Sequence, residues 1–133
     1  MNPRTSALDG RHIVVADEDP AVAHLVIETL LHDGHAVFHA YDGLSAVELA
    51  LNLKICDLVI SNSRIGDVAG IDLIHELRAR LPSLSILYLA NRGRSNPALE
   101  RQLPRGVSIL REPFTAAQLR SAVADLLPHR KAG

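Results

Sequence analysis

Cysteine, aromatic residues and long apolar runs are all scarce in this chain of 133 residues. It has one cysteine, no tryptophan, and two residues each of tyrosine and phenylalanine. A single cysteine excludes an internal disulfide and fits a reducing compartment. Cys56 lies just before an apolar segment, where a buried and unreactive thiol is expected. No apolar stretch reaches the roughly 18 residues needed to span a bilayer.

Charge of one sign is also lacking, because 14 Lys and Arg residues nearly balance 15 Asp and Glu residues. Proteins that bind nucleic acid usually carry a basic excess, so no nucleic-acid partner is expected. The first six residues contain no apolar run after their one charge, which is unlike a secretion signal. We therefore expect a cytoplasmic protein without a membrane segment.

Five short apolar segments alternate with helical patterns along the chain. Three of them are continuously apolar, as expected of central parallel strands that are covered on both faces. The candidate strands are residues 12–16, 36–40, 58–61, 85–89 and 107–110.

Local signals mark where the helices begin and end. Asp19 followed by Pro20 predicts a capped helix start, and Gly34 predicts its end. Asn96 followed by proline repeats the first signal, and the segment from Thr115 to Gln118 is a capping box.

Repeated strand–helix alternation favours an α/β fold with a doubly wound parallel sheet and right-handed crossovers. No internal repeat or linker divides the sequence. We therefore expect one domain over residues 1–133, with a core at about 10–127 and no output domain.

Polar residues follow four of the candidate strands. In open parallel sheets, ligands bind at the carboxyl ends of the strands, so these residues define a candidate pocket. Two adjacent carboxylates after the first strand suit a hard divalent cation, whereas Asp19 is explained more simply as a helix cap. The strand-end residues are Asp17, Glu18, Asp19, Asn62, Ser63, Ala90, Asn91, Glu112 and Pro113.

With these segments the chain resembles a receiver domain of bacterial two-component response regulators, over roughly residues 10–127. The resemblance implies a three-layer, flavodoxin-like fold with strand order 2-1-3-4-5. It also implies magnesium-dependent phosphorylation of an aspartate by a partner histidine kinase. The matching segments are Ile13-Val-Val-Ala-Asp-Glu-Asp-Pro20, residues 57–70 around Asn62, and Arg111-Glu-Pro-Phe114.

The resemblance assigns the acidic pair to Asp17 and Glu18, but it places the phosphoacceptor position on Asn62. An aspartate carboxylate can attack phosphorus and form an acyl phosphate. The neutral amide of Asn62 has no anionic oxygen with which to attack.

Three further family positions are altered. The hydroxyl residue after the fourth strand falls on Ala90, and the lysine before Pro-Phe falls on Glu112. The aromatic switch residue falls on Ile109. Phosphoryl transfer relies on cations that neutralise the phosphoryl oxygens, so a carboxylate at the lysine position is repulsive.

Loss of nucleophile, cation and sensor together predicts a degenerate receiver, or pseudo-receiver, that acts as a phosphorylation-independent protein interaction module. It is not expected to be an enzyme, because no nucleophile–base pair is visible. Its expected partner is a histidine kinase or phosphotransfer protein. The alternatives are a working phosphoacceptor that uses Asp57 or Asp67, and a small-ligand sensor, which no Gly-rich phosphate loop supports.

The carboxylates of Asp17, Glu18 and Glu112 would crowd one pocket without a lysine. Such crowding raises a pKa or attracts a proton or cation. No cofactor and no metal site are expected, and the scattered histidines add none, although weak binding of Mg²⁺ by the vestigial acidic pair stays open. The Asn62 amide could also donate its hydrogens to these carboxylates. The arginines that could compensate are Arg64, Arg92 and Arg111.

The first helix carries an apolar flank beside its main stripe. Ala23, Ile27 and Leu31 lie on this flank, which is either partly buried by a neighbouring helix or exposed for association. We hypothesise contact with a second copy or with a partner kinase. The stripe that should face the sheet is Val22, Leu25, Val26, Thr29 and Leu30.

Overall fold

The computed structural model describes residues 10–127 apart from 54, 67 and 92. Five parallel strands form the central sheet in the order β2-β1-β3-β6-β7. Counted along the chain, this is the predicted order 2-1-3-4-5. The strands are β1 (His12–Ala16), β2 (Ala36–Ala40), β3 (Leu58–Asn62), β6 (Ser85–Ala90) and β7 (Val107–Arg111).

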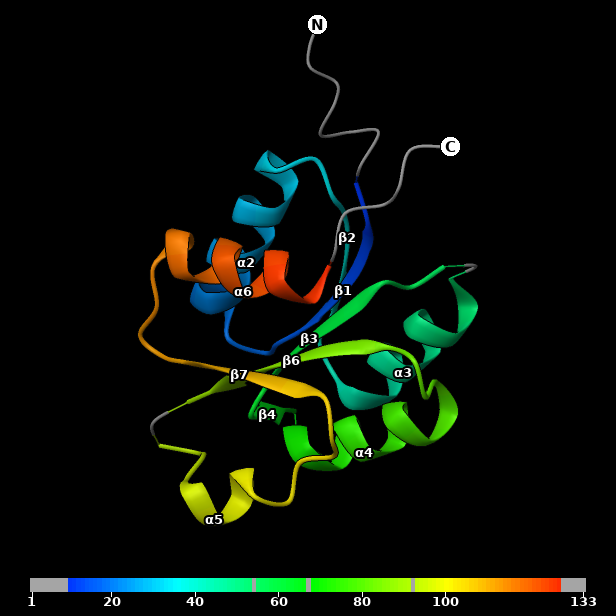
Figure 1. Ribbon diagram of the computed structural model, residues 1–133, viewed down its shortest axis with the longest axis vertical. Coiled ribbons are helices and arrows are strands. Elements are labelled where there is room, and N and C mark those ends of the chain that lie inside the picture. The colour runs from blue at the N-terminus through cyan, green and yellow to red at the C-terminus, as the bar shows by residue number, and fades with distance from the viewer. Residues whose placement is uncertain (1–9, 54, 67, 92, 128–133) are drawn as a thin grey trace, which may run out of the picture.

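Helices cover both faces of this sheet and complete three layers (Figure 1). One face is covered by α2 (Pro20–His32) and α6 (Ala116–Leu126), and the other by α3 (Gly43–Asn52) and α4 (Gly70–Arg80). The single turn α5 (Pro97–Glu100) lies near β7. The predicted flavodoxin-like fold is confirmed. None of the helices in this described part is long and apolar enough to cross a membrane.

Strand alternation divides the apolar side chains between two cores. In β1, Ile13 and Val15 pack under α2 and α6, whereas Val14 and Ala16 pack under α3 and α4. All four are fully buried, because successive side chains of a strand point to opposite faces. A sheet covered on both faces therefore needs the continuously apolar strands that the sequence contains.

The predicted helix signals are confirmed. The Asp19 carboxylate accepts a hydrogen bond from the Ala21 N–H at 3.0 Å, and Gly34 ends α2 with a φ of 89°. Thr115 and Gln118 form the capping box, with bonds of 2.9 and 3.1 Å. The start at Asn96 is also correct, but that helix extends for only four residues.

Three predicted strand ends were one residue too short. Pairing continues through Asn62 with Leu89 and through Ala90 with Arg111, so these residues belong to the strands. Asn62 is therefore the last residue of β3 rather than the first residue after it. A small hairpin of β4 (Arg64–Ile65) and β5 (Val68–Ala69), which was not predicted, follows at once.

The buried face of α2 is rotated from the predicted stripe. Ala23, assigned to the exposed flank, is only 2% exposed, while Val22 and Leu25 keep part of their surface. The cause is α6, which packs beside α2 and extends the buried stripe toward itself. Ile27 is likewise partly buried in that core, so for Ala23 and Ile27 the structure agrees with the first alternative, burial beneath a neighbouring helix. Leu31 is 50% exposed.

Cys56 is half-buried, and its thiol lies 3.7 Å from the carbonyl oxygen of Leu58. Burial raises the pKa of the Cys56 thiol to about 11, so little thiolate exists near neutral pH. The expectation of an unreactive thiol agrees with this environment.

Gly70 fixes the approach of α4 to the end of β3. A Cβ atom on Gly70 would lie 2.1 Å from the backbone oxygen of Asn62 and 3.0 Å from the Cα of Ser63. The Gly70 N–H donates to the Ser63 carbonyl oxygen at 2.9 Å. A side chain at this position would force the backbone of Asn62 to move.

Gly70→Ala is expected to lower the free energy of unfolding by about 2–3 kcal/mol, because the clash is with backbone rather than with a flexible side chain. Gly93→Ala is the matched control, since its Cβ would meet only the Asn91 side chain at 3.5 Å. Urea unfolding of the two variants measures the difference. Equal stability of the two would show that the close approach of α4 is not needed.

Candidate functional site

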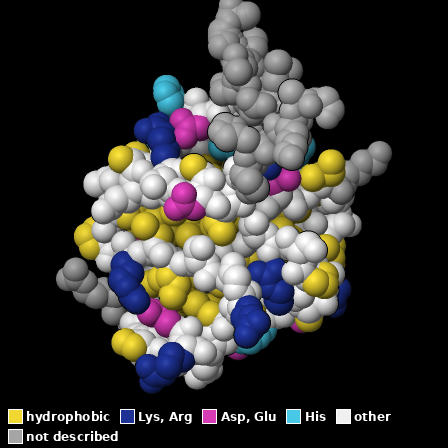
Figure 2. All heavy atoms as spheres, in the orientation of Figure 1, with side chains coloured by type: hydrophobic (Ala, Val, Ile, Leu, Met, Phe, Trp, Pro, Cys, Tyr) yellow, Lys and Arg dark blue, Asp and Glu magenta, His cyan; other side chains and the backbone are white. Residues whose placement is uncertain are grey.

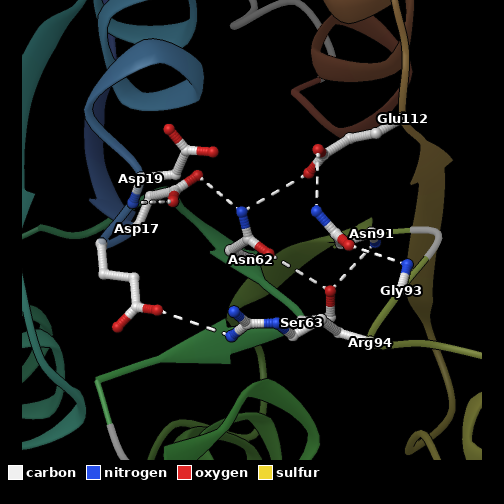
Figure 3. Close-up of polar contacts among 9 residues, drawn as sticks. Asp17, Asp19, Asn62, Ser63, Asn91, Gly93, Arg94 and Glu112 are labelled. Carbon is white, nitrogen blue, oxygen red and sulfur yellow. Dashed lines mark hydrogen bonds and ion pairs between the residues drawn. The ribbon is translucent and has the colours of Figure 1, made fainter.

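Four strands end at one edge of the sheet, where their polar residues converge (Figure 3). Asp17 follows β1, Asn62 ends β3, and Glu112 follows β7. Asp17 and Asn62 are 1% and 5% exposed, so both are shielded from water. Ala90 ends β6, is buried, and accepts a backbone hydrogen bond from the Glu112 N–H at 3.0 Å. The predicted residues are thus brought together.

The side-chain amide of Asn62 lies between two carboxylates. Its Nδ2 donates to Asp17 Oδ2 at 2.9 Å and to Glu112 Oε2 at 3.4 Å (Figure 3). The other Asp17 oxygen accepts from the Asp19 N–H at 2.8 Å. One neutral amide therefore supplies hydrogen-bond donors to carboxylates from two different strand ends.

Neighbouring hydrogen bonds fix which way the Asn62 amide points. The Asn91 N–H donates to Ser63 Oγ at 2.9 Å, so the Ser63 hydroxyl hydrogen is available for Asn62 Oδ1, 3.2 Å away. Since Oδ1 is the acceptor in that bond, the NH₂ group must face the carboxylates. The orientation is a property of the whole network and not of one contact.

Asn91, which follows the neighbouring strand β6, also donates its side-chain amide to a carboxylate. Its Nδ2 donates to Glu112 Oε1 at 3.4 Å, and its Oδ1 accepts from the Gly93 N–H at 2.9 Å. Both oxygens of Glu112 therefore accept from asparagine amides. Glu112 is held by neutral donors at the place that the resemblance assigns to a lysine.

Burial raises the pKa of both central carboxyl groups. For Asp17 the burial effect is opposed by the hydrogen bond from Asn62. For Glu112, burial and the nearby charge of Asp17 raise the pKa, and the bond from Asn91 opposes them. Because these pKa values are higher in the folded chain than in the unfolded chain, the charged site opposes folding at neutral pH.

Among the described residues, arginine compensates the pocket only at its rim. Arg94 lies 3.5 Å from Glu18, and Arg64 also lines the small cavity of about 50 Å³ beside Asp17. Arg111 was expected here, but it extends away and binds Glu100 with bonds of 2.9 and 2.5 Å. Arg92, the third candidate, lies outside the described residues.

The site does not fit a magnesium ion well. Mg²⁺ needs oxygen ligands in near-octahedral geometry, but Asn62 directs N–H donors toward Asp17 and Glu112. Glu18 faces Arg94 at the rim. Within residues 10–127, leaving aside 54, 67 and 92, no group of three or more His, Cys, Asp or Glu side chains is arranged to hold a metal.

A second polar network joins β6, α5 and β7. The Tyr88 hydroxyl donates to Ser95 Oγ at 2.9 Å, and Ser95 Oγ donates to Glu100 Oε2 at 2.9 Å. Arg111 binds the same Glu100 carboxylate, which lowers the pKa of Glu100.

Ile109, the assigned switch residue, is 38% exposed on β7 and outside this network. Figure 2 shows hydrophobic side chains gathered across the middle of the face where β7 lies.

Sequence reasoning placed Ser63 and Asn91 at the strand ends without a role. The signal that could have found them is the excess of carboxylates over hydrogen-bond donors at the strand ends. Three carboxylates without a lysine need donors, and the polar strand-end residues nearest in sequence are amides and a hydroxyl.

Asp57, considered as another phosphoacceptor, precedes β3 and accepts from the His12 N–H at 2.9 Å, at the opposite edge of the sheet. Asp67 is outside the described residues.

A family model described as the response regulator receiver domain matches residues 13–124. The chain belongs to this family.

Among curated relatives, this receiver domain is 30% identical over 117 residues to the transcriptional regulatory protein GlrR of Escherichia coli, covering 87% of this chain and 26% of GlrR. It is 30% identical over 118 residues to the sensor kinase CckA of Brucella abortus, covering 86% of this chain and 12% of CckA. The probable transcriptional regulatory protein TcrX of Mycobacterium tuberculosis is 26% identical, with 80% of this chain and 45% of TcrX covered. The chain thus spans less than half of each relative.

Solved structures agree with the receiver fold. The chemotaxis protein CheY4 of Vibrio cholerae has a TM-score of 0.80 at 20% identity, with 89% of this chain and 99% of CheY4 covered. A response regulator receiver protein of Sinorhizobium medicae has a TM-score of 0.79 at 26% identity, with 90% and 96% covered.

Membership places the chain among domains that interact with histidine kinases or other phosphodonors and that generally bind Mg²⁺ at the phosphorylation site. Some relatives are transcriptional regulators, so a nucleic-acid partner is compatible with the family. The expected absence of such a partner stays a prediction, as does the cytoplasmic location.

Asn62→Asp is expected to destabilise the receiver domain by about 3 kcal/mol at pH 7, because it removes the donors of two carboxylates and adds a third charge. The carboxyl pKa values should rise further above their unfolded values. Stability should therefore recover as pH falls through the raised folded values toward the unfolded ones. Thermal unfolding between pH 4 and 7 measures this recovery.

Asn62→Ala is the control, since it removes the same donors without adding charge. Its recovery on acidification should be smaller than that of Asn62→Asp. Parallel pH profiles for the two variants would mean that charge crowding does not govern this site.

Proposed function

We propose that this receiver domain works without phosphorylation, as a protein–protein interaction module held in one conformational state. The observation that carries the proposal is the orientation of Asn62. At the position where the family resemblance expects a nucleophilic aspartate, this side chain presents an N–H donor that is already bonded to Asp17 and Glu112. An amide in that arrangement has no anionic oxygen for attack on phosphorus.

The surroundings of Asn62 support the same proposal. Glu112 would repel the phosphoryl oxygens that a lysine would attract. Ala90 has no hydroxyl with which to follow the phosphoryl group, and it is 3% exposed. A phosphoryl group at this edge would therefore lack a nucleophile, a hydrogen-bond sensor and the cation of the lysine position.

A single conformational state is supported by the network at β7. Hydrogen bonds join β6, the loop after it, α5 and β7 through Tyr88, Ser95, Glu100 and Arg111. None of these bonds involves the strand-end carboxylates. The hydrogen bonds of Ser95 thus hold the loop after β6 in place without a phosphoryl group. In this proposal the domain is always ready to bind its partner.

The partner is proposed to be a histidine kinase or phosphotransfer protein of a cytoplasmic two-component pathway, and the domain itself is not proposed to catalyse a reaction. The Asp57 alternative is disfavoured by its place at the other edge of the sheet. A small-ligand sensor has less support, because the sequence has no Gly-rich phosphate loop and the cavity beside Asp17 and Asn62 is only about 50 Å³. A larger hollow of about 380 Å³ lies on the other side of Asn91, beside Ala90 and Glu112.

The unmodified protein should form no acyl phosphate with acetyl phosphate and Mg²⁺. Asn62→Asp alone should be labelled weakly, because Glu112 and Ala90 remain unsuited. Addition of Glu112→Lys and Ala90→Thr should raise the labelling rate by about tenfold or more, since a cation and a hydroxyl would then face the phosphoryl group. Intact-mass spectrometry with and without hydroxylamine measures the adduct.

Asn91→Asp serves as a matched control, because it places a carboxylate at the neighbouring strand end and should stay unlabelled. A hydroxylamine-labile adduct on the unmodified protein would refute the proposal. Efficient labelling of Asn62→Asp alone would show that the other substitutions matter little.

A further inference from the structure

An apolar groove of about 430 Å³ runs between α3 and α4, away from the strand-end site. Its floor is formed by Val47 and Leu73, which are 9% and 3% exposed. Val68 of the β4–β5 hairpin lies against Gly43 at the start of α3, where an added Cβ would sit 3.4 Å from it. We call this hollow the α3–α4 groove.

The rim of the α3–α4 groove exposes large hydrophobic side chains. Leu44, Leu51 and Val68 are 70%, 39% and 37% exposed. A second hollow of about 460 Å³ adjoins the groove at Leu51 and includes Ile55, which is 57% exposed. Four of the seven large hydrophobic residues that are exposed among the described residues therefore lie along this one surface.

Acidic side chains border the same groove. Glu48 comes from α3, and Asp72 and Glu76 come from α4. Glu76 binds Arg80 at 2.7 Å, whereas Glu48 and Asp72 have no ion pair with any described residue. The groove is thus apolar at its centre, and its edges carry three carboxylates and one arginine, which gives a net negative charge.

We propose that the α3–α4 groove binds an amphipathic helix of a partner protein, with apolar side chains in the groove and Lys or Arg side chains facing Glu48 and Asp72. Helices bind such grooves through anchors at positions i, i+3, i+4 and i+7. The groove itself presents its apolar side chains at helical spacing, with Leu44, Val47 and Leu51 on α3. The inference deepens the proposed function by naming a partner surface.

Charge selects this occupant over others. A second copy would bring the same acidic rim against Glu48 and Asp72, and nucleic acid would be repelled in the same way. A small ligand is disfavoured because the polar groups of the groove are charged side chains at the rim rather than buried donors. A basic amphipathic helix satisfies both the apolar floor and the negative rim.

The test uses a synthetic peptide of about 15 residues, with Leu at i, i+3, i+4 and i+7 and Lys elsewhere, which is long enough to follow α3. Binding to the full chain is measured by calorimetry, and the contact surface by NMR shift mapping. Shifts should concentrate on α3, β5 and α4. Binding should weaken as salt rises, because the rim charges are exposed.

Leu44→Gln/Leu51→Gln and Glu48→Lys/Asp72→Lys should each weaken peptide binding by about tenfold or more. Glu28→Lys/Asp125→Lys is the matched control, because it makes the same charge change at exposed positions on the opposite face and should bind as the unmodified protein does. Circular dichroism melts confirm that every variant is folded.

Equal loss in the control variant would mean general charge attraction and would overturn the proposal, as would shifts centred on another surface. Groove shifts that appear when the protein alone is concentrated would assign the groove to a second copy instead. Peptide binding does not involve acyl phosphate, so its failure would leave the phosphorylation-independent function standing.

Discussion

The hydrogen bonds from the Asn62 amide to Asp17 and Glu112 are the contacts on which the strand-end arrangement depends. A buried carboxylate is costly unless donors satisfy it, and two close together repel. One amide with two N–H bonds meets both requirements without adding charge. The Ser63 hydroxyl and the Asn91 backbone then hold that amide in orientation. Four strands can therefore end in polar side chains at one edge.

The same arrangement explains why Arg111 is free to act elsewhere. Because neutral donors satisfy Glu112, the adjacent arginine can bind Glu100 and join β7 to α5. Glu100 also accepts from Ser95, which in turn accepts from the buried Tyr88, so the hydrogen bonds continue into the core. Two neighbouring networks thus use different chemistry, since amides stabilise the pocket and an ion pair stabilises the loop beside it.

The order of strands and helices could be predicted from sequence because it rests on local patterns. Continuous apolar runs marked the strands, and the caps at Asp19 and Thr115 marked helix starts. The errors arose where tertiary contacts decide. Burial of Ala23 depends on α6 lying beside α2, and the length of β3 depends on Asn62 pairing with Leu89.

The candidate site was predicted in its residues but only partly in its bonding, because donation by the Asn62 amide was one of several alternatives. Spacing located Asp17, Asn62 and Glu112, because parallel strands end at the same edge. A count of charges then suggested arginines or a cation as compensation. Neutral donors do not appear in such a count, so the role of Asn91 was missed. Arg94 binds Glu18 through a loop whose path no local pattern specifies.

The short segment from Ser63 to Gly70 leaves the strand-end site and returns to it. It is closed by the bond from the Gly70 N–H to the Ser63 carbonyl, and its hairpin carries Val68 to the start of α3. Any equilibrium that shifts Val68 therefore acts on a chain segment whose two ends are fixed beside Asn62. By thermodynamic linkage, whatever free energy binding at Val68 adds to a change at Asn62, that change at Asn62 adds to binding at Val68.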